Sequence, residues 1–141
     1  MIEFDNKYFK ELKFSKKQID SFIDSSNKDL KIAKTSNIPE VKFQFAYNSF
    51  IKIGNALIAC YGYKVSSRVG HHIKILEKLS EILENKDILL YGNKMRKIRN
   101  TEMYDGGIII TDKQAEEYLS FTQEVHKMAQ KILKDIFKSL L

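Results

Sequence analysis

Helix-breaking residues, disulfide-forming cysteines and membrane-length apolar runs are all scarce in this sequence of 141 residues. One proline and six glycines, among abundant Lys, Glu, Ile and Leu, favour helix. The one cysteine, Cys60, cannot form an internal disulfide, which suits a reducing cytoplasm. The longest mainly apolar stretch, from about Ile51 to Tyr61, is too short and too polar to span a membrane. We therefore expect a single cytoplasmic domain over residues 1–141, with no membrane contact.

The spacings typical of metal sites, cofactor loops and activated nucleophiles are also missing. His71 and His72 are adjacent, so on a helix they point about 100° apart and do not form an i, i+4 metal-binding pair. The glycines form neither a GxGxxG motif nor a P-loop. Ser66, Ser67 and Cys60 have no oriented histidine and acid in their sequence context. The sequence therefore predicts no metal and no cofactor.

Positive charge is present, but it comes mostly from lysine. The net charge is +6, and arginine occurs only at positions 68, 96 and 99. Lysines scattered over solvated helix faces are common, so the charge alone is weak support for a nucleic-acid-binding surface.

Helix signals follow one another along most of the chain. Capping boxes are expected at Ser15–Gln18 and Thr111–Gln114, and Pro39 suits the first turn of a helix. Apolar periodicity then predicts helices over about 15–33, 38–61, 71–84, 86–104 and 112–141, the second of them central and most buried. Short links between such helices imply an all-α fold, an antiparallel up-and-down bundle of four to five helices.

Three segments between these helices are expected to be irregular. Lys7 to Leu12 is predicted to form a short turn, and Tyr61 to Gly70 a polar connection. Ile108–Ile110 is β-branched but short and isolated, which indicates an extended linker packed on the bundle.

The stretch from Arg96 to Gly106 concentrates the polar chemistry. On a helix, Arg96, Asn100 and Tyr104 form one stripe, because residues four apart are neighbours. Arg99 lies beside this stripe, close to the Met95 edge of the apolar face. Such groups can bind phosphate or a nucleobase. The structural alternative is that Arg99 pairs with a carboxylate of Glu102, Asp105 or a neighbouring helix.

Two of the three histidines, His71 and His72, have two interpretations. His71 and His72, at the start of a helix, are expected either to make capping or interhelical hydrogen bonds or to reach the Arg99 stripe. His71 is our candidate for the second role. His126, between Val125 and Met128, is expected at the surface or the core edge.

Several short motifs, in their order along the chain, resemble those of HEPN domains, the higher eukaryotes and prokaryotes nucleotide-binding superfamily. The resemblance covers about residues 39–133 and is carried by the order and spacing of the motifs. These are Ala46-Tyr47-Asn48, the run from Ala56 to Tyr63, Gly70-His71-His72, the run from Arg99 to Gly106, and an amphipathic last helix.

The resemblance implies a bundle of four or five helices that forms a homodimer. Many HEPN proteins are metal-independent ribonucleases of toxin–antitoxin or phage-defence systems. Others are non-catalytic modules that pair with a minimal nucleotidyltransferase. The resemblance thus implies RNA or a nucleotide as the ligand, and a nucleotidyltransferase as an alternative partner.

The motif residues carry over with one departure. Arg99 matches the family's motif arginine and Asn100 the polar residue after it, while the histidine position falls on Tyr104. Arg99 and Tyr104 are thus the candidate catalytic residues, and Arg96, Asn100 and His71 join them as candidate binding residues. A phenol, with a pKa of about 10, exchanges a proton poorly near neutral pH. We therefore expect binding, with ribonuclease activity as an alternative.

Overall fold

The computed structural model describes residues 2–105 and 109–139, without the side chains of 102–105, 138 and 139. The elements, in chain order, are β1 (Phe9–Glu11), α1 (Lys16–Thr35), α2 (Pro39–Cys60), β2 (Tyr63–Val65), α3 (His71–Ile82), α4 (Lys86–Asp105) and α5 (Asp112–Ser139).

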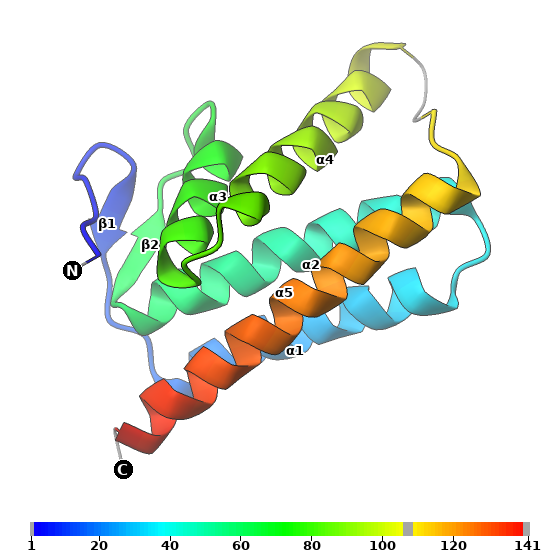
Figure 1. Cartoon of the computed structure of the whole chain (residues 1–141). Helices are drawn as coiled ribbons and strands as arrows, with labels where there is room; N and C mark the ends of the chain where they lie inside the picture. Colours follow the sequence, from blue (N-terminus) through cyan, green and yellow to red (C-terminus); the bar gives the residue numbers. More distant parts are fainter. Residues whose placement is uncertain (1, 106–108, 140–141) are drawn as a thin grey trace.

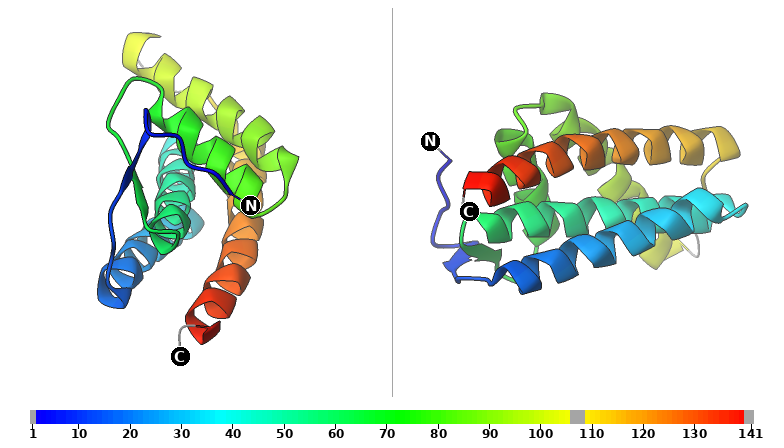
Figure 2. Two further views of the ribbon diagram at one scale, coloured as in Figure 1. Left: turned by 90° about the vertical axis from the view of Figure 1, so that its left-hand side faces the viewer. Right: turned by 90° about the horizontal axis from the view of Figure 1, so that it is seen from below.

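Three long helices form one layer of the molecule and two more helices cover it. Helices α1, α2 and α5 lie side by side, and α3 and α4 pack against each other and on α2 (Figures 1 and 2). This arrangement confirms the predicted all-α helical bundle. It also places α2 in contact with every other helix, so the side chains of α2 can meet those of α3 and α4.

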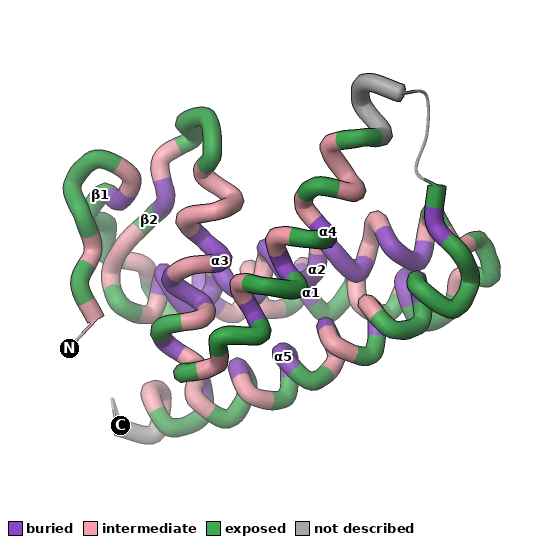
Figure 3. Tube along the Cα trace, turned by 45° about the horizontal axis from the view of Figure 1, so that its top comes forward, coloured by how far each residue is buried: buried purple, intermediate pink, exposed green. Residues whose placement is uncertain are grey.

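Helix α2 is the central helix, as its composition predicts. Phe43, Phe50 and Leu57, spaced seven apart, are fully buried. Buried residues run along most of α2, which packs against all four of the other helices (Figure 3). This burial supplies the apolar area that stabilises the bundle.

The two predicted capping boxes are both formed. The Ser15 hydroxyl accepts from the Gln18 amide nitrogen at 3.1 Å, and the Gln18 side chain accepts from the Ser15 nitrogen at 2.8 Å. Thr111 and Gln114 make the same reciprocal pair ahead of α5, at 3.1 and 3.0 Å. These bonds satisfy backbone donors that a helix start leaves unpaired.

The expectation that Lys7–Leu12 and Tyr61–Gly70 are irregular was wrong in part. Phe9–Glu11 and Tyr63–Val65 pair as a two-stranded antiparallel sheet, with Phe9 opposite Val65. Both of these residues are buried against the core. Strands of three residues are too short to show an alternating pattern, and their partners lie far apart in the sequence.

The link before α5 is partly described. Ile109 is almost fully exposed and Ile110 is buried, so one isoleucine of the predicted linker packs on the bundle. Ile108 lies outside the described residues. None of the described helices is long and apolar enough to cross a membrane.

Candidate functional site

A polar cluster lies where α2, α3 and α4 meet, and its members are Tyr47, His72, Arg96 and Arg99. Tyr47 comes from the middle of α2, His72 from the first turn of α3, and the arginines from the second half of α4. We call these four residues the arginine–tyrosine cluster. Gly70 begins α3 in the left-handed conformation (φ 82°), which a residue with a side chain adopts less readily, and so sets the start of the helix that carries His72.

Tyr47 and His72 are joined by a hydrogen bond. The Tyr47 hydroxyl lies 2.8 Å from His72 Nδ1, and the two ring centroids are 5.7 Å apart. Tyr47 is almost fully buried, whereas His72 is half-buried. A buried phenol usually needs a polar partner. The pair therefore links α2 to α3 at the base of the cluster.

Arg99 lies over the face of this phenol. Its guanidinium carbon is 5.8 Å from the centroid of the Tyr47 ring, within the range of a cation–π contact. Arg96, one turn earlier, donates from Nε to the Asn93 side-chain oxygen at 3.0 Å. Both arginines are half-buried, as is Asn100. This position confirms that Arg99 lies at the edge of the apolar face, near the fully buried Met95.

The structural alternative for Arg99 required a carboxylate partner. No carboxylate pairs with Arg96 or Arg99 among the side chains that the structure describes. The side chains of Glu102 and Asp105 lie outside that set, as does the side chain of Tyr104. The backbone of Tyr104 belongs to α4, so the predicted Arg96–Asn100–Tyr104 stripe lies on one helix.

Burial and the two arginines control protonation in the cluster. Burial, followed by the charges of His71, Arg99 and Arg96, lowers the pKa of His72 from 6.5 to about 4. Burial raises the pKa of Tyr47 well above its ordinary value, although Arg99 and Arg96 oppose this shift. At neutral pH both groups are uncharged, so the cluster carries the positive charge of its arginines alone.

This electrostatic contact gives a measurable prediction. Replacing Arg99 with glutamine should raise the pKa of His72 from about 4, because one of the positive charges that disfavour imidazolium is removed. The rise should be a fraction of the total shift, since burial is its largest cause. Histidine proton NMR through a pH titration measures it. Lys97→Gln, at an exposed position of α4, is the control and should leave the titration unchanged. If the pKa of His72 is the same in Arg99→Gln as in the unmodified chain, the charge of Arg99 does not act on His72.

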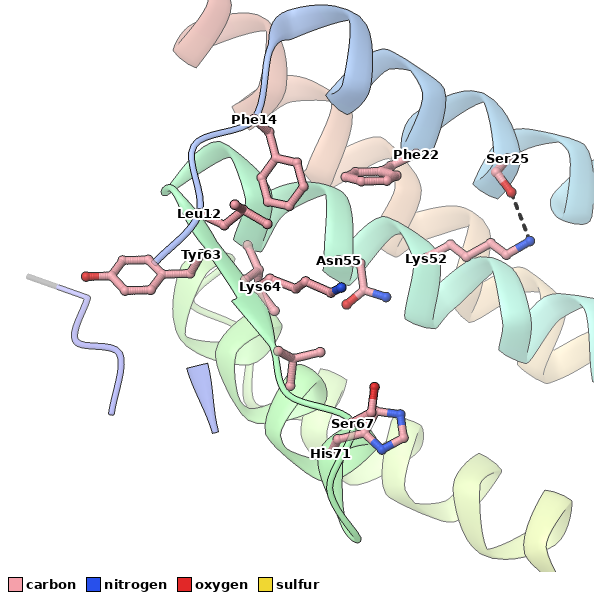
Figure 4. A pocket seen from close by; sticks show the side chains of 12 residues that line it. Leu12, Phe14, Phe22, Ser25, Lys52, Asn55, Tyr63, Lys64, Ser67 and His71 are labelled. Carbon is pink, nitrogen blue, oxygen red and sulfur yellow. Dashed lines mark hydrogen bonds between the residues drawn. The ribbon is translucent and has the colours of Figure 1, made fainter. Parts of the chain in front are cut away.

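The structure distinguishes the two adjacent histidines. His72 joins the arginine–tyrosine cluster, whereas His71, our candidate from the sequence, lines a separate pocket between α1, α2 and β2 (Figure 4). The His71 Nδ1–H donates to the Arg68 carbonyl at 2.9 Å. The rings of the two histidines meet edge to face, 4.4 Å apart. The pairing of Tyr47 with His72 was not predicted from the sequence. The one indication in the sequence is that Tyr47 places a phenol, which needs a polar partner when buried, within an otherwise apolar helix.

The expectation for His126 was wrong, because its side chain is only 3% exposed. His126 Nε2 lies 2.6 Å from the Ser49 hydroxyl and 3.0 Å from the Ser26 hydroxyl. Both hydroxyls already donate to backbone carbonyls, Ser49 to Ser26 and Ser26 to Ser49, so Nε2 must carry the proton. The three buried side chains tie α1, α2 and α5 together. They are closed to substrate, so this serine–histidine contact is structural.

Comparisons with known protein families, with curated proteins and with solved structures find no match to this chain. The described residues contain no group of three or more histidine, cysteine, aspartate or glutamate side chains that could hold a metal ion.

Proposed function

We propose that this chain is a HEPN-like RNA-binding protein that holds RNA phosphates at the arginine–tyrosine cluster. The observation that carries the proposal is the pair of half-buried arginines, Arg96 and Arg99, with no carboxylate partner among the described side chains. A half-buried guanidinium without an anion is poorly compensated, and phosphate oxygens match its planar donors. Asn100, on the same helix, adds an amide beside them.

Binding is favoured over cleavage by the protonation state of the neighbouring groups. Cleavage through the RNA 2′-hydroxyl needs a group that exchanges a proton near neutral pH. His72, with a pKa lowered to about 4, is a weak base, and the raised pKa of Tyr47 makes it a weak acid. The cluster is therefore suited to electrostatic binding, with stacking of a base on Tyr104 as an additional contact.

Two further parts of the proposal rest on the HEPN resemblance. A homodimer would bring two clusters together, and a role in a toxin–antitoxin or phage-defence system would supply the RNA target. Pairing with a minimal nucleotidyltransferase is the alternative. Light scattering of the purified chain, and its co-purification with a neighbouring nucleotidyltransferase, separate these assemblies.

The direct test is RNA binding by Arg99→Ala. Loss of one charge-assisted contact should weaken binding of a short, labelled single-stranded RNA about tenfold, roughly 1.4 kcal/mol. Binding by the unmodified chain should also weaken as salt increases. Fluorescence anisotropy in the presence of a chelator measures both effects and excludes contributions from divalent metal.

Lys97→Ala is the matched control for this experiment. Lys97 lies on α4 between the two arginines in sequence, is exposed, and carries the same charge. Its replacement should change RNA affinity less than twofold, roughly the value of one solvated charge. Equal effects of Arg99→Ala and Lys97→Ala would overturn the proposal. So would unchanged RNA affinity in Arg99→Ala accompanied by a lower melting temperature, since Arg99 would then be structural.

A further inference from the structure

A pocket that does not include the arginine–tyrosine cluster lies between α1, α2 and β2. Its volume is about 410 Å³, within the range of pockets that bind small organic molecules. It is lined by side chains from the segment before α1, from α1 and α2, and from β2 and the start of α3 (Figure 4). We call it the α1–β2 pocket.

One part of this pocket is aromatic and aliphatic. Phe14 and Phe22 meet edge to face with ring centroids 5.4 Å apart, and Leu12 and Ile58 join them in the lining. Both phenylalanines are half-buried, so their rings remain partly accessible from the pocket. Apolar walls of this kind favour a flat or branched apolar body, because its transfer from water is favourable.

The other part of the pocket is polar and basic. Lys64, from β2, extends its amine toward the side-chain amide of Asn55 on α2 (Figure 4). Lys64 has no ion-pair partner among the described side chains, and Asn55 has no hydrogen-bond partner among them. No carboxylate lies in the described lining. The amine and the amide are therefore free to donate to an anion that enters the pocket.

Lys52 also lines the pocket, but its charge is already compensated. Its amine lies 2.7 Å from an Asp29 carboxylate oxygen and 2.9 Å from the Ser25 hydroxyl. This leaves Lys64 as the main unpaired cation of the lining. A ligand with one anionic group is therefore a better match than one with several.

We propose that the α1–β2 pocket binds a small amphiphilic anion, an apolar body of up to three rings that carries one carboxylate, sulfonate or phosphate group. The apolar body would pack on Phe14 and Phe22, and the anionic group would accept from Lys64 and Asn55. This inference is independent of RNA binding, because Arg96 and Arg99 do not line the pocket.

The test compares two fluorescent probes that share the same rings. 1-Anilinonaphthalene-8-sulfonate carries one anionic group, and N-phenyl-1-naphthylamine is its neutral counterpart. The folded protein should bind the sulfonate at one site, and Lys64→Gln should weaken this binding about tenfold, while affinity for the neutral probe stays unchanged. Asn55→Leu, which keeps the branching at Cγ but removes the amide, should act in the same direction.

Two further variants make the outcome decisive. Lys31→Gln, which removes an exposed lysine of α1 outside the lining, should leave affinity for both probes unchanged. Ser67→Trp, at an exposed position of the lining, should weaken the binding of both probes by filling part of the pocket. Equal sulfonate affinity in Lys64→Gln and Lys31→Gln, or binding at many sites, would overturn the proposal. Arg99→Ala should leave sulfonate binding unchanged. The pocket proposal and the RNA-binding proposal are therefore tested independently of each other.

Discussion

Lowering the pH from about 7 to about 4 should remove on the order of 3 kcal/mol of unfolding free energy through one residue, His126. Burial lowers the pKa of His126 from 6.5 to about 4 in the folded chain, while hydrogen bonding by the Ser49 backbone opposes the shift. Once Nε2–H donates to Ser49, Nδ1 is an acceptor without a partner among the described residues. Protonation would add a second buried N–H with nothing to accept it, at a considerable free-energy cost.

The sign follows from proton binding in the two states. Between pH 6.5 and about 4, the unfolded imidazole binds a proton that the folded His126 does not, so the folded state loses stability as the pH falls. This contribution is complete above pH 6.5. The half-buried His72, whose pKa is also lowered to about 4, adds in the same direction with a smaller effect because solvent screens it.

Urea denaturation across this pH range measures the effect. His126→Gln keeps an amide donor at a similar reach but cannot be protonated, so its unfolding free energy should fall less steeply with pH than that of the unmodified chain. Val125→Ala is the control: it truncates the fully buried neighbour on α5 and should lower stability by a similar amount at every pH. Parallel curves for His126→Gln and the unmodified chain would exclude His126 as the source.

Sequence periodicity predicts most of the bundle, and a finer use of it also accounts for His126. In α5, the core positions Ala115, Leu119 and Thr122 continue in alternating steps of four and three. The next step is His126, so this spacing predicts that His126 is buried, whereas it was expected at the surface or the core edge. A prediction based on apolar residue types alone leaves His126 out, because the buried stripe of α5 also contains a threonine and a histidine. The spacing of three and four residues identifies the buried face whatever the residue type.

The same spacing places Arg99 correctly and shows where sequence analysis stops. Ile88, Gly92 and Met95 are buried on α4 in steps of four and three, and the next step is Arg99. Periodicity gives the face of each helix but not how neighbouring helices are rotated against one another. The meeting of Tyr47 with His72 depends on that rotation, so neither residue could be assigned to the cluster from one helix alone. The same limit applies to the α1–β2 pocket, which needs a strand that the sequence did not indicate.

Gly92→Ala should destabilise the protein by about 1–3 kcal/mol, although alanine is the better helix former by about 1 kcal/mol. A Cβ added at Gly92 would lie 2.5 Å from Leu76 Cδ2, 3.2 Å from Cδ1 and 3.3 Å from Cγ, closer than carbon atoms pack. Leu76 is fully buried on α3, so its side chain has little room to move away. The close approach of α4 to α3 therefore depends on the missing side chain at position 92.

A double-mutant cycle in urea denaturation tests this cause. Leu76→Val removes both δ carbons, so Gly92→Ala combined with Leu76→Val should lose less stability than the sum of the single variants. Gly54→Ala is the matched control, because its added Cβ would lie 2.7 Å from Ile75 Cγ2 and has no contact with Leu76, so Leu76→Val should not rescue it. Additive losses in the Gly92 cycle would contradict the steric explanation.

This packing also connects stability to the proposed function. Gly92 lies one turn before Arg96 and two turns before Arg99, so a displacement of α4 at this point would move both arginines away from Tyr47 and His72. Folded Gly92→Ala protein should therefore bind RNA more weakly than the unmodified chain, and Leu76→Val should restore part of the affinity. Gly54→Ala, which acts between α2 and α3, should not be restored. Rescue of stability and of RNA binding by the same substitution would show that the α3–α4 contact positions the arginines.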